Sequence, residues 1–216
     1  MKILTAKLDK PEVVAVYSKM ALFYNIWGAL TESKAREKAI LRADIQDGQA
    51  VLEVAVGTGL TFFEILKTNP NGENVGIDLT PAMLEKARLQ AARSGAVNYK
   101  LTTGDAYDLQ FTDRHFDLVM NNYMFDLLPE QDFLTVLAEF KRVLKPGGRL
   151  VLVNMTRGVH FYQQIWEGVY KLNPRWLGGC RGVLLADHLK VAGFSAIQRE
   201  MISQFGFPSE IISATN

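Results

Sequence analysis

The most informative segment of this chain is Val51-Leu-Glu-Val-Ala-Val-Gly-Thr-Gly-Leu-Thr61. Its apolar first half predicts a buried strand over 51–55, and its glycines predict a tight turn into a helix over 60–68. Gly57 and Gly59 have no Cβ, so the backbone there can turn sharply and approach a ligand closely. The first turn of the helix would point unpaired N–H groups at the same place, which suits a carboxylate or a phosphate.

Acidic residues mark the ends of the next two predicted strands. Asp78 closes an apolar run 25 residues after Glu53, and Asp105 follows 27 residues later. Each interval is about the length of a strand, a helix and their turns in a βαβ unit. Parallel strands present their carboxyl ends at one edge of the sheet, where open α/β sheets bind ligands. We therefore expect the three acids to meet at one binding edge.

The residue types at this edge suggest the kind of ligand. Asp78 is placed to accept hydrogen bonds from a ribose diol, and Asp105 with the Ala106 backbone is placed to bond a purine edge. A phosphate-bearing dinucleotide fits poorly, because Leu60-Thr-Phe62 follows Gly59 and the fingerprint G-x-G-x-x-G is absent. An adenosyl ligand that carries an amino acid in place of phosphates fits better.

The rest of the chain continues the alternation of strands and helices, which predicts a doubly wound, Rossmann-like α/β sheet that is mostly parallel. Pro11 and Pro81 stand at predicted helix starts, and a polar helix begins at Thr31 with a capping-like sequence. A short join across Gly206-Phe-Pro208 predicts a C-terminal antiparallel hairpin. The further predicted elements are helices within 11–46, strand 74–78, helix 81–93, strands 97–102 and 116–121, helix 130–143, strand 149–155, helix 183–192, and strands 195–204 and 209–214.

Composition excludes several classes of protein. The 216 residues carry 24 basic and 23 acidic side chains, a net charge of +1, so no nucleic-acid partner is expected. A single cysteine, Cys180, allows no internal disulfide, and the three histidines lack metal-ligand spacing, so no metal site is expected. The N-terminus does not read as a signal peptide, and no apolar run reaches the roughly 18 residues of a membrane span. A cytoplasmic setting is expected.

The order of these motifs resembles the class I S-adenosylmethionine (SAM) methyltransferases. Their first motif, roughly E/D-x-G-x-G-x-G, matches Glu53, Gly57 and Gly59, while Ala55 stands where the family usually has glycine. The resemblance covers about half of the chain and implies a seven-stranded sheet with one reversed strand. The segments 76–84, 104–106 and 116–122 resemble the second, third and fourth motifs, and 145–150 resembles the turn into the fifth strand.

The resemblance implies SAM as the cofactor. Glu53 would contact its methionine or ribose part, Asp78 its ribose, and Asp105 with Ala106 its purine. The implied cofactor contacts are Tyr17, Glu53, Ala55, Gly57, Thr58, Gly59, Asp78, Leu79, Met83, Asp105, Ala106 and Asn121.

The segment from Tyr17 to Asn25 resembles the Y-x-x-x-A-x-x-Y-D segment of one subgroup. That subgroup includes ubiquinone/menaquinone C-methyltransferases and bacterial phosphatidylethanolamine N-methyltransferases, and its segment covers the cofactor; here Asn25 replaces the usual acid. The resemblance implies a small-molecule or lipid-like acceptor of the phospholipid-amine or quinone-precursor class. Peripheral membrane contact through these N-terminal helices stays open, although they carry few lysines.

We therefore expect one domain over 1–216, with a helical lid over 1–46 and a cofactor-binding core over 47–155. The aromatic segment 156–182 would be an insertion on the substrate side, and 183–216 would hold the last helix and the hairpin. Tyr24 and His160 are the candidate catalytic residues. The expected substrate pocket contains Tyr24, Trp27, Tyr123, His160, Tyr162 and Trp166.

Two other functions remain open. A noncatalytic SAM- or nucleoside-binding module would share the same motifs, and a Rossmann oxidoreductase is disfavoured by the missing third glycine. The sequence Asn121-Asn-Tyr-Met124 is not the N/D-P-P-Y motif of enzymes that methylate amino groups of DNA bases or glutamine. The sequence does not choose between nitrogen, oxygen and carbon as the methylated atom, and it does not give the oligomeric state.

Overall fold

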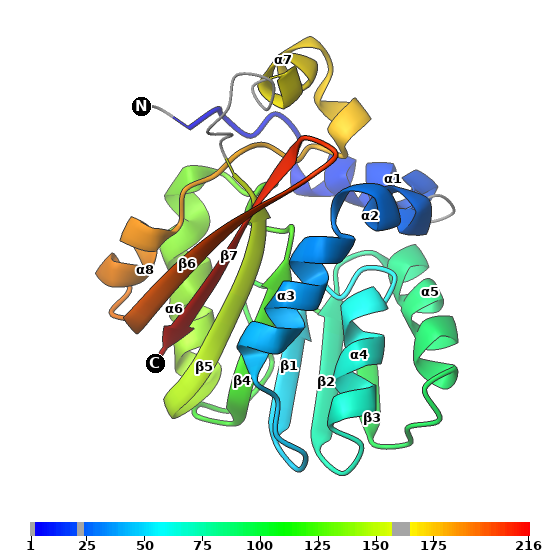
Figure 1. Ribbon diagram of the computed structural model, residues 1–216, viewed down its shortest axis with the longest axis vertical. Coiled ribbons are helices and arrows are strands. Elements are labelled where there is room, and N and C mark those ends of the chain that lie inside the picture. Colours follow the sequence, from blue (N-terminus) through cyan, green and yellow to red (C-terminus); the bar gives the residue numbers. More distant parts are fainter. Residues whose placement is uncertain (1–2, 21–23, 157–164) are drawn as a thin grey trace.

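The computed structural model describes residues 3–20, 24–156 and 165–216, which form a seven-stranded sheet with helices on both faces (Figure 1). The strand order is β3-β2-β1-β4-β5-β7-β6. The first five strands in that order pair in parallel, and β7 is antiparallel to both β5 and β6. The predicted doubly wound, mostly parallel sheet with a C-terminal hairpin is confirmed. The strands are β1 Ala50–Val54, β2 Glu73–Asp78, β3 Tyr99–Thr103, β4 Phe116–Asn122, β5 Leu144–Met155, β6 Ser195–Gln204 and β7 Phe207–Thr215.

Alternate side chains of β1 enter two different cores, because successive residues of a strand point to opposite faces of the sheet. Val51 packs in a cluster with residues of α3 (Ser33–Ala43), α4 (Leu60–Thr68) and α5 (Pro81–Ala92). Leu52 packs in a second cluster with residues of α6 (Phe133–Val143) and α8 (Ala186–Val191). Both side chains are fully buried. Because β1 is buried on both faces, its carboxyl end, where the following turn begins, is held in place by both cores.

The remaining helices gather at one end of the molecule. Figure 1 shows α1 (Lys10–Met20), α2 (Tyr24–Thr31) and α7 (Ile165–Leu172) beyond the carboxyl ends of the parallel strands. A short 3-10 helix, η3 (Pro174–Leu177), follows α7, and another, η1 (Glu130–Asp132), precedes α6. These segments lie at the edge of the sheet where the ligand was expected.

Several boundaries differ from the prediction. β3 begins at Tyr99 instead of residue 97, α6 at Phe133 instead of residue 130, since 130–132 form η1, and α8 at Ala186 instead of residue 183. β5 begins at Leu144 instead of Arg149, because Leu144 already pairs with Phe116 of β4; the register then shifts, and regular pairing resumes at Arg149 opposite Leu118. The hairpin turns at Phe205-Gly206, both with positive φ (48° and 79°), so β7 begins at Phe207 instead of Ser209; two positive φ angles match the favoured two-residue hairpin turn. The capping-like start at Thr31 was wrong, since Thr31 ends α2 and α3 has no side-chain cap.

Candidate functional site

The three predicted acids meet at the carboxyl ends of β1, β2 and β3. Asp78 is the last residue of β2 and pairs with Thr103, two residues before Asp105. These two acids line a cavity of about 340 Å³. Glu53 pairs with Gly76 and lines a second cavity of about 50 Å³. The two cavities adjoin, since both are lined by Ala55, Gly57, Asn122 and Tyr123.

The turn between β1 and α4 has alternate residues in the left-handed region. Ala55, Gly57 and Gly59 have φ of 57°, 56° and 82°. A Cβ added at Gly57 would meet nothing within 4 Å, whereas one at Gly59 would lie 2.8 Å from Cα of Ala87 on α5. Gly59 therefore permits the packing of α4 against α5, and Gly57 keeps open the space above the turn. Ala55 adopts the same backbone conformation at a cost of roughly 1–2 kcal/mol for a residue with a Cβ.

The carboxylate of Asp78 holds this turn in place. Its Oδ2 accepts a hydrogen bond from the Gly57 N–H (2.8 Å), and its Oδ1 accepts one from the Thr80 N–H (2.8 Å). Burial raises the pKa of Asp78, and these hydrogen bonds oppose the rise. Each carboxylate oxygen can accept a further bond. Asp78 can therefore order the loop and also accept from a hydroxyl in the cavity.

Glu53 is a buried carboxyl with one open oxygen. It is 1% exposed, and its Oε1 accepts a hydrogen bond from Asn122 Nδ2 at 3.2 Å. Its Oε2 has no hydrogen-bond partner among the described residues. Burial raises the pKa of Glu53 to about 8, with Asn122 and Arg36 acting in the opposite direction. An unpaired buried polar atom is costly, so this oxygen beside a cavity suits a cationic or N–H ligand.

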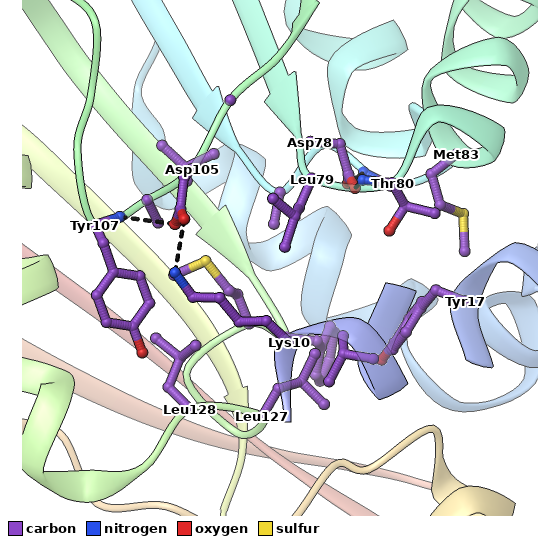
Figure 2. A pocket seen from close by; sticks show the side chains of 18 of the residues that line it. Lys10, Tyr17, Asp78, Leu79, Thr80, Met83, Asp105, Tyr107, Leu127 and Leu128 are labelled. Atoms are coloured by element: carbon purple, nitrogen blue, oxygen red, sulfur yellow. Dashed lines mark hydrogen bonds and ion pairs between the residues drawn. The ribbon is translucent and has the colours of Figure 1, made fainter. Parts of the chain in front are cut away.

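A chain of polar contacts fastens α1 to the loop after β3. Figure 2 shows Lys10 reaching toward Asp105, and its Nζ lies 2.6 Å from Oδ2 of that carboxylate. The same Nζ lies 3.7 Å from the centroid of the Tyr107 ring. The Tyr107 hydroxyl donates to Asp132 Oδ2 at 2.8 Å, and burial together with Asp132 raises the pKa of Tyr107. All four side chains line the larger cavity.

The side of the larger cavity formed by the N-terminal segment and the loop after β4 is mostly apolar. Tyr17 closes one end, and its hydroxyl lies 3.6 Å from Sγ of Cys180. Tyr123, the first residue after β4, is buried with φ of 53°, and its hydroxyl hydrogen-bonds Ser209 Oγ at 2.7 Å. This wall suits a largely apolar group. Its apolar members are Leu8, Val13, Met124, Leu127, Leu128 and Pro129.

The structure brings most of the predicted cofactor residues to these two cavities. Gly59 and Asn121 line neither cavity; the buried Asn121 instead donates from Nδ2 to the Val54 carbonyl at 2.8 Å. The larger cavity is lined by Tyr17, Ala55, Gly57, Asp78, Leu79, Met83, Asp105 and Ala106, and the smaller one by Glu53 and Thr58 as well as Ala55 and Gly57.

The predicted substrate residues are more scattered. Tyr123 lines both cavities, but Trp166 lines neither. Trp166 donates from Nε1 to the Gly206 carbonyl at 2.9 Å and packs its ring against Phe207, so it holds α7 to the β6–β7 turn. His160 and Tyr162 lie outside the described residues, as do the side chains of Tyr24 and Trp27.

Several cavity residues were not predicted. Asn122 lies next to the predicted Asn121, and the alternation of strand side chains could have favoured it, because its side chain reaches Glu53. Lys10, Tyr107 and Asp132 carry no motif of their own. They lie far apart in the sequence. Tyr107 meets Asp132 where the loop after β3 packs against η1, and Lys10 joins them through the packing of α1.

The described residues hold no cluster of three histidine, cysteine, aspartate or glutamate side chains that suits a metal ion. Cys180 is buried, and burial raises the pKa of its thiol well above the ordinary value. Within the described ranges, no helix has both the length and the apolar character needed to cross a membrane.

Comparison with known proteins agrees with this geometry. Residues 51–148 match the family model described as a methyltransferase domain. The chain is 30% identical to the demethylmenaquinone methyltransferase of Lactococcus lactis, over 80% of this chain and 70% of that protein. It is 28% identical to that of Lactobacillus johnsonii, over 99% and 91%. It is also 30% identical to the arsenite methyltransferase of Halobacterium salinarum over 72% of this chain, but the match spans only 40% of that relative.

The fold extends to proteins of very different sequence. The solved structure of the [4+2]-cyclase SpnF covers 100% of this chain and 98% of its own, with a TM-score of 0.77 at 17% identity. A shared fold does not fix the reaction, which depends on the site. Here the motifs on β1 to β4, the adjoining cavities at their ends and the curated relatives agree. The chain belongs to the class I SAM-dependent methyltransferases.

Proposed function

We propose that this protein transfers a methyl group from SAM to an apolar aromatic small molecule of the quinone-precursor class. One observation carries the proposal: a cavity of about 340 Å³ has carboxylates at the sheet edge and an apolar wall from the N-terminal segment and the loop after β4. The acidic part suits the adenosyl group, and the apolar wall suits a hydrophobic ring beside it. The two demethylmenaquinone methyltransferase relatives support this class of acceptor.

The residues present fit the cofactor. Asp78 would accept from the ribose hydroxyls, and Asp105 with the Ala106 N–H would bond the purine. The open oxygen of Glu53 in the smaller cavity would accept from the ammonium of the methionine part. The open space at Gly57 leaves room for the ligand to lie against the turn. Bound SAM supplies an electrophilic methyl group on its sulfonium, so the protein's part is binding, orientation and electrostatics.

The chain's own contribution at the acceptor is alignment. Tyr17, Tyr123 and Leu127 would hold a flat ring at a fixed distance from the methyl group. Positioning of this kind can lower a barrier by about 7–11 kcal/mol in favourable cases. The same apolar wall would keep water from the reacting atoms.

An arsenite acceptor is the second candidate, because one relative is an arsenite methyltransferase. Arsenite is thiophilic, and several thiolates are its natural ligands. This chain has one cysteine, Cys180, which is buried and whose raised pKa keeps it a thiol. The cavity therefore favours the aromatic acceptor.

The test is a labelled-methyl assay with three acceptors offered separately: a demethylated quinone precursor in detergent, vesicles of phosphatidylethanolamine, and arsenite. Label in the quinone fraction, with equal release of S-adenosylhomocysteine, is the expected result, and the Asp78→Ala variant gives the background. Label only in the lipid amine or only in arsenic would assign a different acceptor. SAM at 100 times its dissociation constant should stabilise the fold by about 2.7 kcal/mol. If this stabilisation is seen without turnover on any acceptor, the protein is a binding module. Stabilisation by NAD alone would indicate an oxidoreductase.

A further inference from the structure

Four large apolar side chains are exposed at the end of the molecule beyond the cavity. Ile165 and Leu172 on α7 are 63% and 79% exposed, Trp176 on η3 is 63% exposed, and Phe205 at the hairpin turn is 80% exposed. These four residues are called the apical surface below. Burying each of them would be favourable, so a cluster of this kind indicates an interaction surface.

A hydrogen bond and helix packing join the elements of the apical surface. Trp166 on α7 donates to the carbonyl of Gly206, the neighbour of Phe205, at 2.9 Å. Ile165 and Leu172 are seven residues apart and so lie on the same side of α7. η3 follows α7 after a single residue and packs against it. Figure 1 shows α7 at the extreme end of the molecule, with the β6–β7 turn below it.

The apical surface is also joined to the segment that covers the cavity. The Tyr170 hydroxyl on α7 donates to the Thr5 carbonyl at 2.9 Å, and Arg175 on η3 lies 2.9 Å from the Glu12 carboxylate. Glu12 is on α1, whose Lys10 and Val13 line the cavity. A partner seated on the apical surface would therefore lie close to the cover of the cavity.

The charges around the apical surface indicate its partner. Lys7, Lys171 and Arg175 are exposed there, whereas two nearby acids, Glu12 on α1 and Glu167 on α7, are only partly exposed. Glu12 is held by Arg175. Exposed leucine, phenylalanine and tryptophan with a cationic border is the composition of segments that lie in the interface of an anionic bilayer. Tryptophan suits that position because its ring is apolar while its N–H stays hydrated.

We propose that the apical surface docks on an anionic phospholipid bilayer and brings the cavity to an acceptor dissolved in the lipid. This inference rests on the proposed function, in which the acceptor is apolar. It differs from a membrane contact made by the N-terminal helices themselves, because the inserted side chains come from α7, η3 and the hairpin turn. The N-terminal segment lies between this surface and the cavity.

The test is cosedimentation with vesicles of phosphatidylethanolamine and phosphatidylglycerol, compared with vesicles of phosphatidylcholine alone. The wild-type chain should bind the anionic vesicles, and high salt should weaken this binding. Leu172→Glu and Phe205→Glu should each lower vesicle affinity by about tenfold or more. The matched control is Leu41→Glu, which changes a similarly exposed leucine (73%) near the end of α3 and should bind as the wild type does.

Equal binding of all three variants, or no vesicle binding by the wild type, would overturn the proposal. Concentration-dependent dimers that Leu172→Glu disrupts, without lipid binding, would overturn it in favour of a second copy of the chain. Assaying the same variants with a soluble acceptor in detergent separates the two proposals. Docking variants that keep detergent turnover but lose turnover on vesicle-borne acceptor support docking, whereas vesicle binding without turnover on any acceptor contradicts only the proposed function.

Discussion

The ammonium group of Lys10 lies 2.6 Å from the carboxylate of Asp105, across the edge of the larger cavity. Lys10 is the first residue of α1, and Asp105 follows β3, so this ion pair fastens the N-terminal segment to the cofactor-binding edge. Both side chains are partly exposed, at 46% and 37%. An exposed ion pair contributes only about 0–1 kcal/mol to stability. Its main role is therefore to position α1 beside the cavity.

Lys10→Met should therefore weaken SAM binding without unfolding the chain. Loosening α1 should raise the dissociation constant by about three- to tenfold, equivalent to roughly 1 kcal/mol, while the free energy of unfolding changes by less than about 1 kcal/mol. Calorimetric titration and urea denaturation measure the two effects. Lys7→Met, in the same segment but outside the cavity lining, is the control. Tighter SAM binding by Lys10→Met would show instead that Lys10 competes with the ligand for Asp105.

Asp78→Ala should damage both the ligand contact and the turn. The carboxylate accepts hydrogen bonds from Gly57 and Thr80, so its removal leaves two N–H groups without their acceptor. Hydrogen bonds to charged groups are worth about 1.5–3 kcal/mol. SAM affinity should fall about ten- to a hundredfold, and stability should fall as well. An unchanged dissociation constant would mean that the ribose lies elsewhere.

Alanine substitutions at the two glycines of the turn should have different effects on stability and on SAM affinity. Gly59→Ala places its Cβ 2.8 Å from the Ala87 backbone and should cost several kcal/mol of stability, about 1–3 from overpacking and 1–2 from the left-handed backbone. Gly57→Ala meets no atom within 4 Å and should cost only the backbone term, about 1–2 kcal/mol. Its methyl group would occupy the ligand's space, so it should lose more SAM affinity. Equal stability of the two variants would contradict the α4–α5 contact.

The sequence predicted the sheet because β1 to β5 carry strong local signals: apolar strands, glycine turns and terminal acids. It also placed Asp78 and Asp105 in one cavity, since parallel topology brings strand ends together. Lys10, Tyr107 and Asp132 were not predicted, because their contacts depend on how α1 and η1 pack beside the loop after β3 and not on local pattern. Trp166 was expected in the pocket only because the segment 156–182 is rich in aromatic residues. Composition does not distinguish an aromatic side chain that lines a pocket from one that packs against a hairpin.

Stability should depend on pH through Glu53. Burial raises its pKa from 4.5 to about 8 in the folded state, so the folded chain binds more protons than the unfolded chain between these values. This contribution is fully present below pH 4.5 and is lost as the pH rises through about 8. Burial also raises the pKa of Asp126 to about 7, so this carboxyl acts in the same direction at slightly lower pH.

Glu53→Gln should therefore flatten the loss of stability between pH 5 and 8, by an amount on the order of a few kcal/mol. Urea denaturation across this range compares the variant with the wild type. Asp126→Asn serves as the parallel case, with a window ending near pH 7. Identical pH profiles for wild type and Glu53→Gln would show that the carboxyl is ionised in the folded protein.

Tyr17 and Trp166 should separate a cavity residue from a structural one. Tyr17 lines the larger cavity beside Cys180, so Tyr17→Ala should lower turnover by about tenfold or more through lost alignment, with a smaller change in stability. Trp166 bonds the Gly206 carbonyl and packs on Phe207, so Trp166→Ala should cost about 3–5 kcal/mol of stability. At a temperature where Trp166→Ala remains folded, its turnover should approach that of the wild type. If turnover falls in both variants while both keep wild-type stability, Trp166 reaches the acceptor and the pocket extends to α7.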